Sequence, residues 1–98
     1  MMIREMIDEV ETSTHPVARA LHKGEHFKIL VIAFKKGMKL KDHQAHLTSK
    51  LTVLEGHIAY IQGESKIKLN KFEDIDIPVN VIHSVEALQN SLCLLSQG

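Results

Sequence analysis

The chain of 98 residues has no tryptophan, one cysteine, two prolines and only 4% aromatic residues. Because Cys93 is alone, no disulfide can form within the chain, which favours a reducing, cytoplasmic location. No apolar run approaches the roughly 20 residues that a membrane-spanning helix requires. The segment from Met1 to Glu11 is too acidic for a signal peptide. We therefore expect a cytoplasmic protein that has no membrane partner.

Neither sign of charge dominates the sequence. Twelve basic and twelve acidic residues give a formal net charge of zero when histidine is neutral. A lysine cluster surrounds Gly37, but no aromatic side chains lie among these lysines, whereas single-stranded nucleic acids are bound by stacking on aromatic side chains inside a basic groove. The sequence thus predicts no nucleic-acid partner.

Turn-forming residues recur every 7–13 residues or so after Pro16, as they do in a sandwich or barrel of short strands. They include Gly24, Gly37, Gly56, Gly63, Asn70, Asn80 and Asn90. We expect an all-β domain over residues 15–98, made of two antiparallel sheets. Residues 1–14 form an arm or a short helix, because apolar residues recur there at helical spacing.

Individual strands carry more specific patterns. The segment from Phe27 to Phe34 is apolar on both alternating faces apart from Lys28, so both faces need cover. We expect a homodimer in which the partner subunit covers Leu30, Ile32 and Phe34 on the outward face.

Two further strands predict which side chains point inward. Residues 64–69 alternate, with Ile67 and Leu69 inward. Residues 81–87 place His83 on the same face as Val81, Val85 and Ala87, among apolar neighbours. Leu92 to Leu95 reads as a final buried strand, in which Cys93 is a small core residue.

Two segments resemble the conserved motifs of the cupin superfamily. Residues 37–56, GMKLKDHQAHLTSKLTVLEG, are similar to the first motif, G-x5-H-x-H-x3,4-E-x6-G. Residues 72–87, FEDIDIPVNVIHSVEA, are similar to the second, G-x5-P-x-G-x2-H-x3-N. The resemblance extends from Pro16 to Leu95 and is strongest to the short single-domain cupins of bacteria. It implies a double-stranded β-helix, the jelly-roll barrel of that family.

The metal ligands that the resemblance implies are only half present. His43 and His83 match the first and third histidines, whereas Ala45 and Ser49 replace the second histidine and the glutamate. His46 lies three residues after His43, so a regular strand points it to the opposite face. Only a bulge or a loop brings both rings into one cavity.

Two other substitutions fall at glycines of the second motif. Phe72 replaces the first glycine, which predicts a turn that avoids positive φ. Asn80 replaces the second glycine, and asparagine tolerates the left-handed conformation better than most residues.

Two functions remain open for a cupin with this sequence. The first is binding of a small molecule in the barrel interior, without a cofactor, in a pocket lined by His43, Ser49, Leu51, Tyr60 and His83. The alternative is a metal-dependent enzyme of the dioxygenase or isomerase kind. In that case His43, His46 and His83 bind a divalent transition metal. The remaining histidines, at positions 15, 22, 26 and 57, lie near turns and are expected to be solvated.

Overall fold

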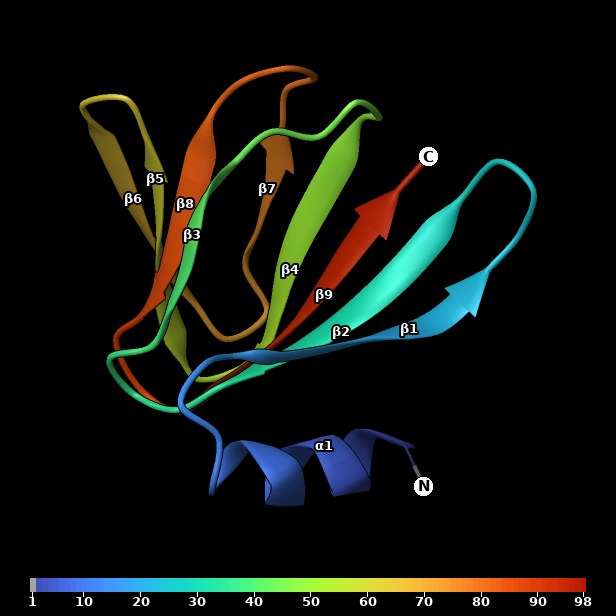
Figure 1. The fold of residues 1–98 in the computed structure, drawn as a ribbon. Helices are drawn as coiled ribbons and strands as arrows, with labels where there is room; N and C mark the ends of the chain where they lie inside the picture. The colour runs from blue at the N-terminus through green and yellow to red at the C-terminus, as the bar shows by residue number, and fades with distance from the viewer. Residues whose placement is uncertain (1) are drawn as a thin grey trace.

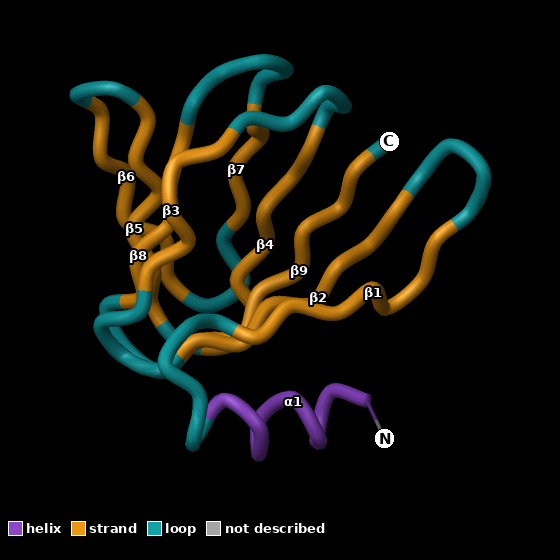
Figure 2. The backbone as a smooth tube through the Cα atoms, in the orientation of Figure 1, coloured by secondary structure: helices purple, strands orange, loops and turns teal. Residues whose placement is uncertain are grey.

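A computed structural model describes residues 2–98, apart from the side chains of Asp42 and His43. Within these residues one helix precedes nine strands, and the strands form two sheets that face each other (Figures 1 and 2). The helix is α1 (Met2–Val10). The strands are β1 (Val17–Lys23), β2 (Lys28–Phe34), β3 (Lys39–His43), β4 (Ser49–Glu55), β5 (His57–Gln62), β6 (Ser65–Asn70), β7 (Asp74–Ile77), β8 (His83–Ala87) and β9 (Ser91–Gln97).

The strand order confirms the predicted double-stranded β-helix. The five-stranded sheet has the order β1-β2-β9-β4-β7 and the four-stranded sheet the order β3-β8-β5-β6. Every pairing between these strands is antiparallel. Strands far apart in sequence, such as β2 and β9, are therefore neighbours, and local turns alone do not produce the barrel. Within residues 2–98 no helix is long and apolar enough to cross a membrane.

The inner faces of the two sheets make one apolar core. Alternate residues of each strand point inward, which is the period-two pattern of a half-buried strand. As predicted, Val85 and Ala87 lie in this core on the face of β8 that carries His83, and Cys93 lies there on β9. The core consists of Ile32, Phe34, Leu51, Val53, Ile58, Tyr60, Leu69, Ile77, Val85, Ala87, Cys93 and Leu95.

The outer face of β2 is covered by α1 (Figure 1). Met6 and Val10 of the helix pack with Val31, Ala33 and Val17 in a second apolar cluster. Two ion pairs hold the helix on the sheet, Glu9 with Arg19 at 2.9 Å and Glu11 with Lys35 at 2.7 Å. Both pairs are partly exposed, so each contributes only about 0.2–1 kcal/mol, and apolar packing dominates.

This packing corrects the face that we assigned to the dimer interface. Ile32 and Phe34 point into the barrel core and are 2% and 1% exposed, and Leu30 packs against the same core. The other face of β2, with Val31 and Ala33, is the outer one, and the chain's own helix covers it. The sequence shows that both faces of the strand need cover, but it does not say what provides the cover.

Ile67 and Leu69 both lie on the predicted inward face of β6, where they pair with Tyr60 and Ile58, but only Leu69 is buried. Leu69 is 6% exposed, whereas Ile67 is 42% exposed. Strand β6 is the edge of the four-stranded sheet, and it packs into the core only at its Leu69 end. Alternation identifies the inward face of a strand but does not identify an edge, where that face lacks a neighbour on one side.

The turn between β6 and β7 also differs from expectation. Phe72 has a φ of 70°, in the left-handed region that the sequence was expected to avoid, and Asn80 has a φ of 61°. The Phe72 N–H donates to the Val53 carbonyl at 2.7 Å, which fixes the turn against β4. The ring of Phe72 is 74% exposed, with the ammonium of Lys71 5.0 Å from its centroid.

We expect Phe72→Gly to raise the free energy of unfolding by about 1 kcal/mol, because a non-glycine residue at positive φ costs roughly that much and the exposed ring contributes little packing. Asn80→Gly is the matched control and should gain no stability, since asparagine already tolerates this conformation and the change removes its side-chain contact with His46. Urea denaturation measures both values. A loss of stability in Phe72→Gly would show that the ring supplies more than the strained backbone costs.

Because the Cys93 thiol is buried, we expect the free energy of unfolding to fall at alkaline pH. Burial raises the pKa of Cys93 to about 12, whereas an unfolded thiol titrates near ~8.5. Above that pH the unfolded chain loses a proton that the folded chain retains, so the contribution to stability is complete below pH ~8.5 and falls as pH rises toward about 12. At pH 10 the loss amounts to roughly 2 kcal/mol. Urea titrations at pH 7 and 10 should show this loss in wild type and not in Cys93→Ala, and an equal loss in both would refute it.

Candidate binding site at the open end of the barrel

The two sheets diverge toward the end of the barrel where the β3–β4 and β7–β8 loops lie, at the top of Figure 1. Strand register places one row of the five-stranded sheet at this end. Lys28 pairs with Gln97, Gln97 with Ser49, and Ser49 with Ile77. The next inward row pairs Leu30, Leu95, Leu51 and Ile75. A mostly polar row thus lies above an apolar one.

The four-stranded sheet repeats this arrangement. The Cα atoms of His43 and His83 pair across β3 and β8. Ile61 pairs with Ser84, so Gln62 and His83 are the next residues of β5 and β8. One inward row deeper, Leu40, Val85, Tyr60 and Ile67 pair in sequence. We call Lys28, Ser49, Gln97, Gln62 and His83 the polar layer.

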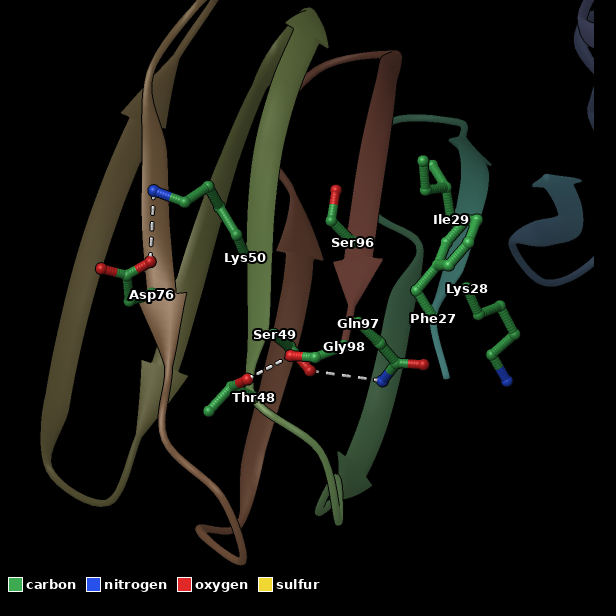
Figure 3. A pocket seen from close by; sticks show the side chains of 10 residues that line it. All are labelled: Phe27, Lys28, Ile29, Thr48, Ser49, Lys50, Asp76, Ser96, Gln97 and Gly98. Carbon is green, nitrogen blue, oxygen red and sulfur yellow. Dashed lines mark hydrogen bonds and ion pairs between the residues drawn. The ribbon is translucent and has the colours of Figure 1, made fainter. Parts of the chain in front are cut away.

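Hydrogen bonds within each sheet hold parts of the polar layer in place. The Tyr60 hydroxyl donates to Gln62 Oε1 at 2.8 Å, and its ring stacks on His83 with centroids 5.6 Å apart. Burial raises the pKa of Tyr60, so its hydroxyl stays protonated and remains a donor. On the facing sheet, Gln97 Nε2 donates to Ser49 Oγ at 3.3 Å (Figure 3). His83 and Ser49 are only 3% and 6% exposed.

Two hollows open at this end of the molecule. One, of about 470 Å³, is lined by Ile61, Gln62, Gly63, Val81, Ile82 and His83. The other, of about 400 Å³, extends over the outer face of the five-stranded sheet and is shown in Figure 3. Its lining is Phe27, Lys28, Ile29, Thr48, Ser49, Lys50, Asp76, Ser96, Gln97 and Gly98. The polar layer contributes to both hollows, with Ser49 lining one and His83 the other.

The carboxylates nearest the second hollow are engaged on the outer face. Lys50 Nζ lies 3.2 Å from Asp76 and 3.7 Å from Asp74. The hydrogen bond from Lys50 to Asp76, with the charge of Asp74, raises the pKa of Lys50. This group is therefore a solvated ion-pair network, and it lies on the sheet face opposite the polar layer.

Comparison with solved structures shows which known proteins share this fold. An RmlC-like cupin from Desulfovibrio desulfuricans aligns with a TM-score of 0.79 at 25% identity, covering 86% of this chain and 82% of its own. A cupin 2 conserved barrel domain protein from Leptotrichia buccalis gives 0.80 at 26% identity, covering 88% and 42%. The chain therefore has the cupin fold. KdgF from Halomonas sp. also aligns, at 0.77 and 17% identity over 88% and 82%, which shows the shared fold alone. No family model and no curated protein matches the sequence.

The structure places the predicted pocket residues of this chain at different depths. Leu51 and Tyr60 are 1% and 2% exposed and belong to the apolar core below the polar layer. Ser49 and His83 lie in the polar layer, on opposite sheets. The side chain of His43 lies outside the described part of the structure, although its backbone pairs with His83.

His46 lies in the loop between β3 and β4. It is exposed, and its Nδ1 is 3.1 Å from Asn80 Oδ1. The Asn80 N–H also donates to the Ala45 carbonyl at 2.8 Å, so the two loops are tied together. Among the described side chains no three histidine, cysteine or acidic groups gather as metal ligands. The predicted set of His43, His46 and His83 includes a side chain outside this description, so it stays a prediction.

Sequence reasoning missed Lys28, Gln62 and Gln97. Each lies two residues from an inward apolar residue of its own strand, so strand alternation was the signal for its direction. The cupin motifs do not cover Gln62 or Gln97, and the rows appear only when strands are aligned by register. His57, expected to be solvated, has a buried Nδ1 that forms no hydrogen bond within the described residues. The residue is half-buried and not fully solvated, because β9 and the loop before it cover the turn at Gly56.

Proposed function

We propose that this cupin binds a small polar molecule at the open end of the barrel, in contact with the polar layer. The observation that supports this proposal is the matched pair of rows, in which polar residues of both sheets lie above apolar ones. Burying a polar group costs free energy unless it is hydrogen-bonded. A barrel end packed only for stability would therefore continue the apolar rows. Ligand sites combine apolar walls with a few convergent polar groups, and this end of the barrel has that composition.

The chemistry of the polar layer favours a ligand rich in acceptor oxygens. Lys28 supplies an ammonium that can donate hydrogen bonds, whereas the Ser49 hydroxyl donates to the Leu47 carbonyl and His83 Nδ1 to the Val81 carbonyl. Gln62 accepts from Tyr60 through Oε1, which leaves its amide N–H groups to donate. None of these five residues carries a carboxylate. Hydroxyl, carbonyl or carboxylate groups on a small organic molecule would complement this set.

An NMR titration tests the proposal. Pools of small hydroxylated and carboxylated organic molecules are added to ¹⁵N-labelled protein, and the side-chain amide signals of Gln62 and Gln97 are followed. At least one pool should shift these signals, and Gln62→Leu should weaken the binding roughly tenfold, as expected for a lost hydrogen bond of about 1–1.5 kcal/mol. Lys68→Gln, on the outer face of β6 and away from both hollows, is the matched control and should leave binding unchanged. Shifts confined to the outer face would contradict the proposal.

A second candidate, metal-dependent catalysis of the dioxygenase or isomerase kind, rests on the orientation of His83. Its Nδ1 is 3.1 Å from the Val81 carbonyl. A carbonyl only accepts, so Nδ1 carries the proton and, in the neutral ring, Nε2 carries the lone pair. Histidines that bind metals are usually oriented in this way by a hydrogen bond from their other ring nitrogen. His43 and His46 would supply the remaining ligands for a divalent transition metal.

Metal analysis of protein purified without a chelating tag tests this second candidate. Stoichiometric metal that is lost in both His83→Ala and His46→Ala would support it, and uptake should fall at low pH because imidazole binds metal only when neutral. His26→Ala, on the exposed β1–β2 turn, is the control. Substoichiometric metal, or uptake unchanged by His46→Ala, would rule out the three-histidine site.

A further inference from the structure

An apolar hollow lies where the outward flank of α1 meets β1. Its volume is about 590 Å³, and it is lined by Met2, Ile3, Arg4, Ile7, Asp8 and Leu21. Strand β1 is the edge of the five-stranded sheet, so no further strand lies beside it. We call these six residues the helix flank. It faces solvent beside the second apolar cluster, on the outer side of the barrel.

Two large apolar side chains of the helix flank are exposed to solvent. Ile7 is 46% exposed and Leu21 is 44% exposed, whereas Met6 and Val10 on the buried face of the same helix are 2% and 4% exposed. Helical spacing puts Ile3 and Ile7 on one side of α1, next to the buried face. The amphipathic helix therefore has a wider apolar surface than its own sheet covers, and such exposed patches usually mark an interaction site.

The charges of the helix flank differ from those of the rest of the helix. Glu9 and Glu11 are paired with Arg19 and Lys35 on the barrel. Arg4 and Asp8 are exposed and form no ion pair within the described residues, although they lie four positions apart on the same side. Their order also opposes the helix dipole, which favours an anion near the N-terminus and a cation near the C-terminus. These two charges thus do little for the isolated helix.

We propose that the helix flank binds the same flank of a second copy, forming a two-fold symmetric dimer in which the two α1 helices lie antiparallel. In that arrangement Arg4 of each copy approaches Asp8 of the other, and Ile7 and Leu21 are buried between the copies. A two-fold interface brings one surface against itself, so it requires a self-complementary surface. One cation and one anion on either side of an apolar centre meet that requirement.

The antiparallel arrangement also makes the interactions of Arg4 and Asp8 with a helix dipole favourable. Arg4 would lie near the negative C-terminal end of the partner's helix, and Asp8 near its positive N-terminal end. A partner of another kind would need this same inverted charge pattern, which the second copy already has. A stable interface usually buries about 800 Å² per partner. A nine-residue helix and part of one strand supply less than that, so we expect a dimer of micromolar affinity.

Sedimentation velocity at protein concentrations from about 1 to 500 μM tests the proposal, because a reversible dimer depends on concentration. Arg4→Asp and Asp8→Arg should each weaken dimerisation at least ~10-fold, since each places like charges opposite one another twice. The double variant R4D/D8R reverses both charges and should restore the dissociation constant to within ~3-fold of wild type. Far-UV circular dichroism checks that each variant keeps its helix.

Lys68→Asp, on the edge strand of the other sheet, is the matched control and should leave the dissociation constant unchanged. A wild-type protein that stays monomeric over the whole range would overturn the proposal. So would a dimer that neither single reversal weakens, because its interface would then lie elsewhere. Failure of the double variant to recover would show that Arg4 and Asp8 do not face each other across the two-fold axis.

Discussion

Gly56→Ala should lower the free energy of unfolding by roughly 2–5 kcal/mol. The residue has a φ of 93°, where an alanine costs about 1–2 kcal/mol. A Cβ atom there would also meet the Asn90 carbonyl oxygen and Ser91 Oγ, and it would lie 2.7 Å from Ser91 Cα. These atoms begin β9, and Ser91 Oγ bonds both to Gln89 and to His57, so they cannot move freely. Overpacking of this kind adds about 1–3 kcal/mol.

Gly37→Ala separates the cost of the positive φ from the cost of the steric overlap. Gly37 has a φ of 90°, but apart from its two chain neighbours no described atom lies within 4 Å of the position of its Cβ. This variant should therefore lose only the backbone term of about 1–2 kcal/mol. Urea denaturation of both variants gives the difference. Equal losses would mean that the loop around Asn90 yields to the added methyl group.

Phe34→Ala should lower the free energy of unfolding by about 3–5 kcal/mol, because it removes a large buried side chain and leaves a cavity. Phe34 is 1% exposed and belongs to the barrel core. It is on the strand that joins the two apolar clusters, with Ala33 facing α1. The second cluster should therefore weaken with it, which a loss of helical circular dichroism at intermediate urea concentrations would reveal.

Phe72→Ala is the matched control for this change. It removes the same atoms at a site that is 74% exposed, so stability should change by no more than about 0.5 kcal/mol. If the two variants lost similar amounts, the apolar core would contribute much less to stability than its burial indicates. Thermal unfolding monitored by circular dichroism provides the comparison.

Most of the fold was predictable because it follows from local patterns. Spaced turn residues and period-two alternation define short strands, and the two cupin motifs define how such strands are arranged. The burial of His83 and Cys93 followed from strand parity, because a side chain shares the environment of residues two positions away. The candidate site was predicted only in part. The motifs identified Ser49 and His83, but Gln62 and Gln97 lie outside them.

By itself, the sequence determined that this protein is a cupin barrel, that both faces of β2 are covered and that half of the metal motif is replaced. Tertiary structure decided the rest, because each remaining question depends on segments far apart in the chain. A partner subunit and the chain's own helix would bury the same apolar area, so the sequence pattern does not distinguish between them. In the structure the helix covers Val31 and Ala33. Phe72 takes a left-handed conformation because its amide meets Val53 on another strand. The polar layer exists because register sets residues 28, 97 and 49 side by side, and no local pattern encodes a pairing between strands that the sequence separates.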